Sequence, residues 1–183
     1  MARLTRITTR SGDRGTTRLA DGRKVAKDDP RIEALGAVDE LASVLGVLLA
    51  EPLPPAIRRR LERVQHHLLD LGAEIALPGR AQLDPGAVAR LERWQAALGR
   101  GLGPLEEFLL PGGCRPAALA HQARAVCRRA ERRVAALERG HGPRPGPEPV
   151  RYLNRLSDLL FVLARRLNRI AGVPEPLWSP GGR

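Results

Sequence analysis

Apolar side chains recur at alternating steps of three and four residues along three long segments, and this spacing constrains the fold more than any other feature. The first two segments carry Leu35, Val38, Ala42, Leu45 and Leu49, and then Leu61, Val64, Leu68, Leu71 and Ile75. The third carries Leu153, Leu156, Leu160, Leu163, Leu167 and Ile170. Such steps align apolar residues along one narrow seam of an α-helix, which suits helices that cross at about +20°. The pattern predicts a bundle of long helices.

Proline and glycine residues predict where five helices begin and end. The first helix begins at Pro30, behind Asp28 and Asp29, because proline suits the first helical turn and an acidic residue caps it; Pro52 ends it. Four further helices are expected between these approximate limits: Pro55 and Pro78, Asp84 and Gly99, Pro116 and Glu138, and Pro149 and Ala171. No segment shows the alternation that is typical of a strand. The predicted class is all-α, an antiparallel bundle of four long helices and a shorter one.

The chain of 183 residues, 43% of them hydrophobic, is long enough for one domain with a sizeable core. We divide this single domain, 1–183, into residues 1–27 outside the bundle, the bundle 28–171, and a flexible tail 172–183 rich in proline and glycine. No apolar run approaches the ~18 residues of a membrane helix, and the start lacks the apolar core of a secretory signal. Two cysteines without metal-ligand spacing favour the cytoplasm.

The net charge of +11 has several explanations. A strongly basic chain can bind nucleic acid, a membrane surface or an anionic small molecule. The charge can also be a solvated surface, because all but two of the basic residues are arginine and the chain is rich in Ala, Gly and Pro, as a GC-rich genome would encode. Aromatic residues, at 3%, are too few for the stacking platforms of single-strand binders.

Residues 8–18, TTRSGDRGTTR, combine two glycines with hydroxyl and arginine side chains. A floppy tail would have this composition, and so would a phosphate loop. Glycine lets backbone N–H groups approach a phosphate, while hydroxyls and cations complete the cradle. The segment is not a Walker A motif, because the GxxxxGK[ST] spacing is absent.

The fourth predicted helix places charged residues beside its apolar seam. At about 100° per residue, Arg124, Arg128 and Glu131 border the seam in HQARAVCRRAERRV, whereas Arg129 and Arg133 point away from it. Charges in such positions need partners. An intrahelical ladder of salt bridges or an anion site would satisfy them. Polar residues also interrupt the apolar runs of the first and fifth helices, at Asp39, Asn154 and Asp158.

Four blocks together resemble one family, the PduO-type ATP:cob(I)alamin adenosyltransferases. They are TTRSGDRGTT, KDDPRIEALGAVDEL, FLLPGG with HQARAVCRRAERRV, and YLNRLSDLLFVLAR, and they follow the family's order over residues 5–171. The resemblance implies a homotrimer of five-helix bundles with active sites between subunits. It also implies the reaction: cobalt(I) of a reduced corrinoid attacks C5′ of ATP, and adenosylcobalamin and triphosphate form.

The resemblance assigns site residues by position. The implied ATP ligands are Thr9, Arg10, Ser11, Gly12, Thr17, Arg18, Lys27, Arg128, Arg129, Glu131, Arg132 and Asn154. Many relatives have lysine where this chain has Arg10. Phe108 would lie against the corrin and exclude the lower axial ligand of cobalt, although by itself it reads as a core aromatic. Asp39 would pair with Arg124 of a neighbouring chain, so that Arg128, Phe108, Asp39 and Arg124 form the catalytic set.

The implied reaction also names further participants. Magnesium would accompany ATP, the free loop would be disordered and close over the nucleotide, and no metal site belongs to the protein itself. A reductase that supplies electrons and an adenosylcobalamin-dependent mutase are expected partners, and neither nucleic acid nor a membrane is. The rival interpretations are a basic helical module that binds nucleic acid and a structural bundle that serves as an adaptor.

Overall fold

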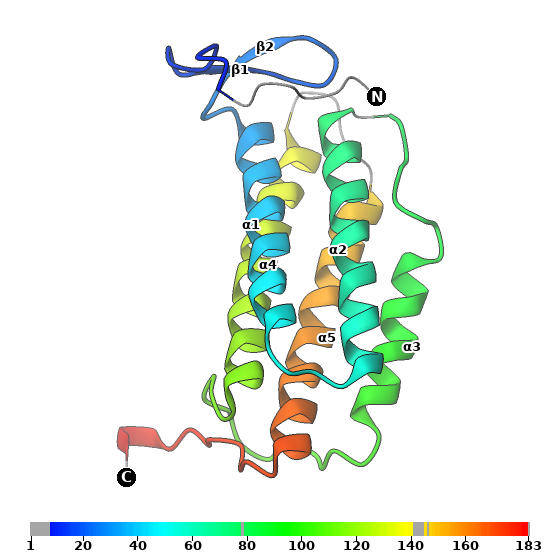
Figure 1. Ribbon diagram of the computed structural model, residues 1–183, viewed down its shortest axis with the longest axis vertical. Helices are drawn as coiled ribbons and strands as arrows, with labels where there is room; N and C mark the ends of the chain where they lie inside the picture. Colours follow the sequence, from blue (N-terminus) through cyan, green and yellow to red (C-terminus); the bar gives the residue numbers. More distant parts are fainter. Residues whose placement is uncertain (1–7, 78, 141–144, 146, 183) are drawn as a thin grey trace.

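The computed structural model describes residues 8–77, 79–140, 145 and 147–182. In this part of the chain five α-helices run side by side in an antiparallel bundle, as the seams predict (Figure 1). Their bounds are α1 Pro30–Ala50, α2 Pro55–Ala76, α3 Ala87–Gly99, α4 Arg115–Arg139 and α5 Pro147–Ala171. A short 3-10 turn, η1, spans Pro180–Gly182. None of the helices described is long and apolar enough to cross a membrane.

The helix starts follow from local hydrogen bonds. The Asp29 carboxylate accepts a hydrogen bond from the backbone N–H of Arg31 at 2.8 Å, which confirms the predicted cap of α1. The α3 helix starts later than predicted, because the Asp84 carboxylate accepts a hydrogen bond from the N–H of Gly86 at 2.7 Å and closes a turn first.

The bundle core is made from the predicted seams. Leu45, Leu61, Leu71, Leu156 and Leu160 are all completely buried. Ile170 is an exception, 53% exposed in the last turn of α5. On α4 the buried residues are mostly small and include Ala117, Ala120, Ala123, Cys127 and Ala130, with Val126, Val134, Leu137 and His121 as the larger ones. Small side chains let α4 pack closely between α1 and α5, and this places its charged borders next to both helices.

The glycine-rich segment leads into a β-hairpin outside the bundle, at the end where α1 begins (Figure 1). Strands β1 Thr16–Arg18 and β2 Lys24–Ala26 pair antiparallel, with Thr17 opposite Val25. The expectation that the chain has no strand is therefore wrong here. A strand of three residues is too short to show an alternating pattern in the sequence.

The tail after Ala171 was predicted to be flexible, and in the structure it pairs with the segment before α4. The N–H of Leu110 donates to the carbonyl of Pro176 at 2.8 Å, and the N–H of Trp178 donates to the carbonyl of Phe108 at 2.7 Å. Glu175 accepts a hydrogen bond from Arg165 of α5 at 2.9 Å. These bonds give residues 175–178 a defined place beside Phe108.

The turn before α4 depends on Gly113, and we expect Gly113→Ala to destabilise the fold. Gly113 has φ +98°, and an added Cβ would lie 2.1 Å from Oδ1 of Asn168. That oxygen accepts a hydrogen bond from the N–H of Cys114, the residue just before α4, at 2.9 Å. Steric strain and the loss of this hydrogen bond should together lower the unfolding free energy by about 2–4 kcal/mol, measured by urea denaturation.

Gly36→Ala is the matched control for this prediction. Gly36 lies within α1, and nothing lies within 4 Å of an added Cβ. Alanine there should raise stability by about 0.5–1 kcal/mol. Equal unfolding free energies for the two variants would contradict the role given to Gly113.

Candidate functional site

The glycine-rich loop folds back on itself so that Lys27 lies against Gly12. The N–H of Gly15 donates to the carbonyl of Gly12 at 3.1 Å, and the N–H of Lys27 donates to the carbonyl of Gly15 at 2.9 Å. A Cβ on Gly12 would lie only 3.0 Å from Nζ of Lys27. The absence of a side chain at Gly12 therefore lets the lysine ammonium approach the loop backbone.

The polar side chains of this loop face solvent. Thr9, Arg10, Ser11, Arg18 and Lys27 are exposed, and Thr17 is half-buried. The hydroxyl oxygens of Thr9 and Ser11 are 2.9 Å apart. Arg18 donates to the carbonyl of Gly22 at 3.1 Å within the hairpin. Hydroxyls, an ammonium and guanidinium groups thus surround a backbone turn, which is the chemistry that binds phosphate.

Residues predicted from different helices meet across α4 and α5. The side-chain amide of Asn154 on α5 donates to the carboxylate of Glu131 on α4 at 2.9 Å. Both residues are half-buried, whereas Arg128 and Arg132 on the same side of α4 are exposed. The structure therefore brings Asn154 and Glu131 together beside two arginines.

The predicted alternative of a salt-bridge ladder along α4 is not found within the described residues. Arg129 pairs with Glu40 of α1, and Arg133 pairs with Glu33 of α1 at 3.6 Å. In the same part of the chain, no carboxylate forms an ion pair with Arg124, Arg128 or Arg132. Among the predicted ATP ligands, Arg129 therefore has its charge neutralised by Glu40. The charges of Arg124, Arg128 and Arg132 are not neutralised by an ion pair within the described residues.

A cleft of about 250 Å³ opens between α3, α4 and α5 beside these residues. Arg124, Arg128, Ser157, Asp158 and Phe161 line it. The guanidinium carbon of Arg124 lies 5.9 Å from the ring centroid of Phe161, and its Nε is buried without a hydrogen-bond partner among the described residues. A buried donor left unpaired costs about 1–3 kcal/mol, so this position of Arg124 is unfavourable within the described chain.

Asp39 is exposed on α1 and does not contact Arg124 within the chain. Sequence reasoning missed Phe161, because LLFVLAR reads as an ordinary apolar run of the fifth helix. The half-burial of Phe161 under an arginine appears only once α4 and α5 are packed together.

Phe108 is not a core aromatic, because 76% of its surface is exposed. Its ring meets the indole of Trp178 edge-to-face, with centroids 6.0 Å apart and planes at 84°. Phe108, Leu109, Leu110 and Trp178 line an open apolar hollow of about 370 Å³. Trp178 was missed by sequence reasoning, since nothing in the tail sequence indicates that it returns to this segment. An exposed apolar hollow of this kind suits a large flat ligand.

The described cleft and loop contain no cysteine nucleophile. Burial raises the pKa of the Cys127 thiol far above neutrality, and its Sγ donates to the carbonyl of Leu153 at 3.2 Å. Burial, and then the charge of Arg124, lowers the pKa of His121, which keeps this imidazole neutral at pH 7. Among the described residues no three metal-ligating side chains gather into one group.

The parts of the candidate site do not meet within one chain. The hairpin lies at one end of the bundle, and the tail that pairs with Phe108 leaves from the other end (Figure 1). The cleft lined by Arg124 and Arg128 lies between these two ends, along α4. Within one chain, the three parts are therefore separate from one another.

Fold and site together define a mostly helical bundle with an arginine-lined cleft on α4 and a separate, exposed apolar hollow at Phe108. The sequence model of the cobalamin adenosyltransferase family matches residues 7–167. The chain therefore belongs to the cobalamin adenosyltransferase family.

Relatives of known name cover nearly the whole chain. A cobalamin adenosyltransferase of Cupriavidus metallidurans is 53% identical over 178 residues, which are 97% of this chain and 96% of that protein. A corrinoid adenosyltransferase of Mycobacterium tuberculosis is 42% identical, over 98% of this chain and 95% of that protein. A variant PduO-type ATP:corrinoid adenosyltransferase from Lactobacillus reuteri, complexed with cobalamin and ATP, superimposes with a TM-score of 0.89 at 30% identity, covering 94% of this chain and 99% of that one.

Proposed function

We propose that this protein transfers the 5′-deoxyadenosyl group of ATP to cobalt(I) of a reduced corrinoid. The observation that carries the proposal is the set of α4 arginines without ion-pair partners in the described chain, next to the Asn154–Glu131 pair, in a member of the cobalamin adenosyltransferase family. In the reaction, an electron pair of cobalt(I) forms the bond to C5′. The C5′–O bond breaks, and its electron pair leaves with triphosphate.

Such a reaction needs alignment and charge stabilisation rather than a general base. Cobalt(I) is already a strong nucleophile, and the leaving group carries about four negative charges. Arg128 and Arg132 can bind the phosphates through charge-assisted hydrogen bonds, with Asn154, which is hydrogen-bonded to Glu131, orienting the nucleoside. Arg129 would bind the phosphates only once its ion pair with Glu40 of α1 is broken.

The N-terminal loop supplies the second half of the phosphate site in this proposal. Its residues are Thr9, Arg10, Ser11, Gly12, Thr17, Arg18 and Lys27, and the approach of Lys27 to Gly12 supports their acting together. The loop closes over ATP when the phosphates replace solvent around these exposed side chains.

Magnesium would enter bound to the phosphates of ATP, as it commonly does where few protein carboxylates are present. The carboxylate of Glu131 could hold the ion directly or through water, since it is half-buried among cations and accepts only one described hydrogen bond, from Asn154. When bound, magnesium would neutralise phosphate charge.

The active assembly in this proposal is a homotrimer with sites between subunits. The hairpin and the tail that pairs with Phe108 lie at opposite ends of the bundle, which supports it, and so does the buried Nε of Arg124 without a described partner. A reductase that supplies electrons and a mutase that receives adenosylcobalamin are the proposed partners. The free thiols of Cys114 and Cys127 suit the cytoplasm, where we propose the reaction occurs.

Asp39→Ala and Arg124→Ala should each weaken assembly. We expect Asp39 of one chain to pair with Arg124 of its neighbour, and removing one partner of a desolvated pair commonly costs about 3–5 kcal/mol. The double variant should cost less than the sum of the two single changes. Light scattering measures the assembly, and a monomer or dimer for the wild-type protein at micromolar concentration would contradict this pairing.

The direct test of function is anaerobic conversion of a chemically reduced corrinoid with MgATP, followed by cobalamin absorbance. Adenosylcobalamin should form, and its absence would overturn the proposal. Thermal stability separates the rival functions: MgATP should raise the melting temperature by mass action, whereas a nucleic-acid-binding module would respond to DNA instead.

A further inference from the structure

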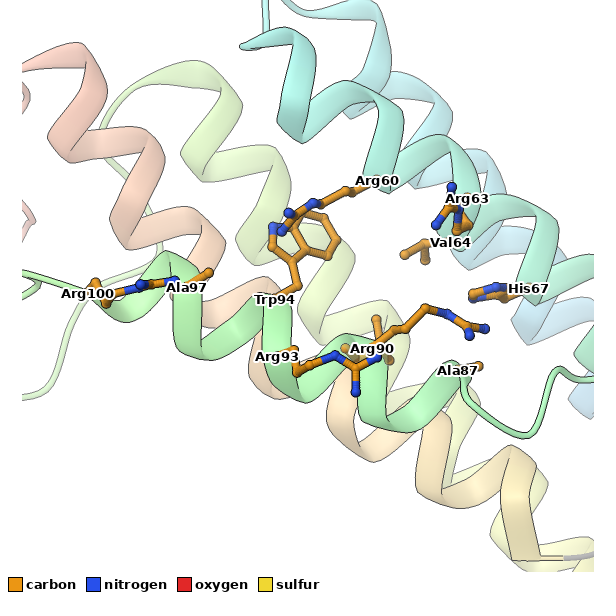
Figure 2. Close-up of a pocket in the computed structure, with 11 residues that line it drawn as sticks. Arg60, Arg63, Val64, His67, Ala87, Arg90, Arg93, Trp94, Ala97 and Arg100 are labelled. Atoms are coloured by element: carbon orange, nitrogen blue, oxygen red, sulfur yellow. The ribbon is translucent and has the colours of Figure 1, made fainter.

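A second basic cleft lies between α2 and α3, and it shares no residue with the α4 cleft. Its volume is about 420 Å³, within the range of small-molecule sites. Five arginines line it and no carboxylate does: Arg60, Arg63, Arg90, Arg93 and Arg100 (Figure 2). The floor is apolar and includes Val64, Leu91 and the buried indole of Trp94.

Most of this positive charge has no partner in the described part of the chain. Arg90 pairs with Asp84 at 2.9 Å, but no described carboxylate forms an ion pair with Arg60, Arg63, Arg93 or Arg100. Glu62, Asp70 and Asp84 line an adjoining cleft with Arg63, His67 and Arg90 and offset part of this charge. The remaining like charges around the cleft repel one another, and a bound anion would relieve that repulsion.

Arg90 provides a second observation that points to a ligand. Its Nε is buried and has no hydrogen-bond partner among the described residues. The guanidinium is packed over Gly86, where an added Cβ would lie 2.7 Å from Nη1. A donor fixed in place and left unpaired is costly unless something else accepts its hydrogen bond.

The cleft has two chemically different ends. At one end Arg63 and Arg90 lie on either side of the His67 ring (Figure 2), whose Nδ1 is 3.0 Å from the Tyr152 hydroxyl, so that Nε2 is the ring nitrogen left for a ligand. At the other end the guanidinium of Arg60 lies over Trp94, 5.6 Å from the ring centroid. Guanidinium forks match phosphate oxygens, and the stacked Arg60 offers a flat surface.

We propose that the α2–α3 cleft binds a phosphate-bearing polyanion, either a free oligophosphate or the phosphate chain of a nucleotide. The ligand's phosphates would lie between Arg63, Arg90 and His67. This site goes beyond the proposed transfer reaction, and it gives the protein a second place to bind an anion of the kind that the reaction releases.

Tryptophan fluorescence can report on this cleft alone. The chain has two tryptophans, so Trp178→Phe leaves Trp94 as the single reporter. Titration with inorganic triphosphate should give a saturable change in Trp94 emission. Arg63→Gln or Arg90→Gln should weaken binding about tenfold or more, the loss expected for one charge-assisted hydrogen bond. Arg63 is exposed, so its replacement should not disturb folding.

Two controls make the result specific. Arg139→Gln removes the same charge from an exposed arginine at the end of α4 that lines neither this cleft nor the adjoining one, and it should change affinity less than about twofold. Arg128→Ala disables the proposed transfer site and should leave the Trp94 response intact. A parallel titration with ATP separates the two sources: tighter binding of ATP assigns the cleft to nucleotides, and tighter binding of triphosphate assigns it to free oligophosphate.

Three outcomes would overturn the proposal: no saturable response to either phosphate at millimolar concentration, equal weakening by Arg139→Gln, or an equal response to poly-glutamate. Each would mean that the cleft attracts anions only through the overall positive charge of the protein. Loss of adenosylation activity alone would not affect this result, because the readout is binding at Trp94.

Discussion

Arg128→Ala should lower kcat/KM for adenosylation about 10²–10³-fold and leave the helical bundle intact. Arg128 is exposed beside the Asn154–Glu131 pair and lines the α4 cleft, and it forms no ion pair with a described carboxylate. Removing one preorganised donor to a developing negative charge typically costs a factor of this size. Calorimetry should also show weaker ATP binding, because the guanidinium would contact the phosphates before and during the reaction.

Asn154→Ala should likewise weaken ATP binding, and Arg151→Ala is the matched control. Arg151 lies on α5 and pairs only with Glu148 among the described residues, in an exposed salt bridge of the kind that contributes little to stability. Wild-type ATP affinity in Arg128→Ala and Asn154→Ala would show that the α4 cluster serves the fold rather than the nucleotide. Circular dichroism should give the same helix content for all three variants.

Phe108→Ala should slow adenosylation roughly 10–100-fold when cobalt(II) must be reduced on the enzyme. In the proposed mechanism the exposed ring lies against the corrin, excludes the lower axial ligand and favours four-coordinate cobalt(II), which accepts an electron more easily. Burying a phenylalanine side chain is worth about 1.5–3 kcal/mol, and each 1.36 kcal/mol corresponds to a factor of ten in rate. ATP binding and assembly should change little.

The same variant has two informative controls. Supplying cobalt(I) already reduced should recover part of the rate, since the ring acts before the transfer step. Phe161→Ala removes the other phenylalanine, which packs under Arg124 in the α4 cleft, so it should disturb the nucleotide side of the reaction instead. A rate from cobalt(II) equal to that of wild type would assign the cobalt-side chemistry to another residue. Global unfolding is not expected, because Phe108 is 76% exposed.

The helices were predictable because the sequence signals that define them lie within a few residues of each other. Seam spacing, the Asp29 cap and the prolines each act within a few residues, and the observed bounds of α1 and α2 follow them. The angular position of Arg124 and Glu131 beside the apolar stripe of α4 was predictable for the same reason, and both are half-buried.

Contacts that depend on packing between distant segments were not predictable. The hydrogen bond between Leu110 and Pro176 joins residues far apart in the sequence, so no local pattern in the tail predicts it. The sequence could not decide whether the arginines of α4 form salt bridges within the helix. The structure shows that Arg129 and Arg133 instead pair with Glu40 and Glu33 of α1. The arginine cleft between α2 and α3 arises only when the two helices face each other.

The separation of the hairpin from Phe108 has a genetic consequence. If each site takes its loop from one chain and its phenylalanine from another, two inactive alleles can complement each other. Chains with Lys27→Ala mixed with chains with Phe108→Ala would restore an intact loop and an intact ring at about one quarter of the interfaces in a random mixture. Chains carrying both changes would rescue neither parent, because every chain in either mixture would then lack the same group. In a cell with two different defective copies, activity would depend on which end of the bundle each copy damages.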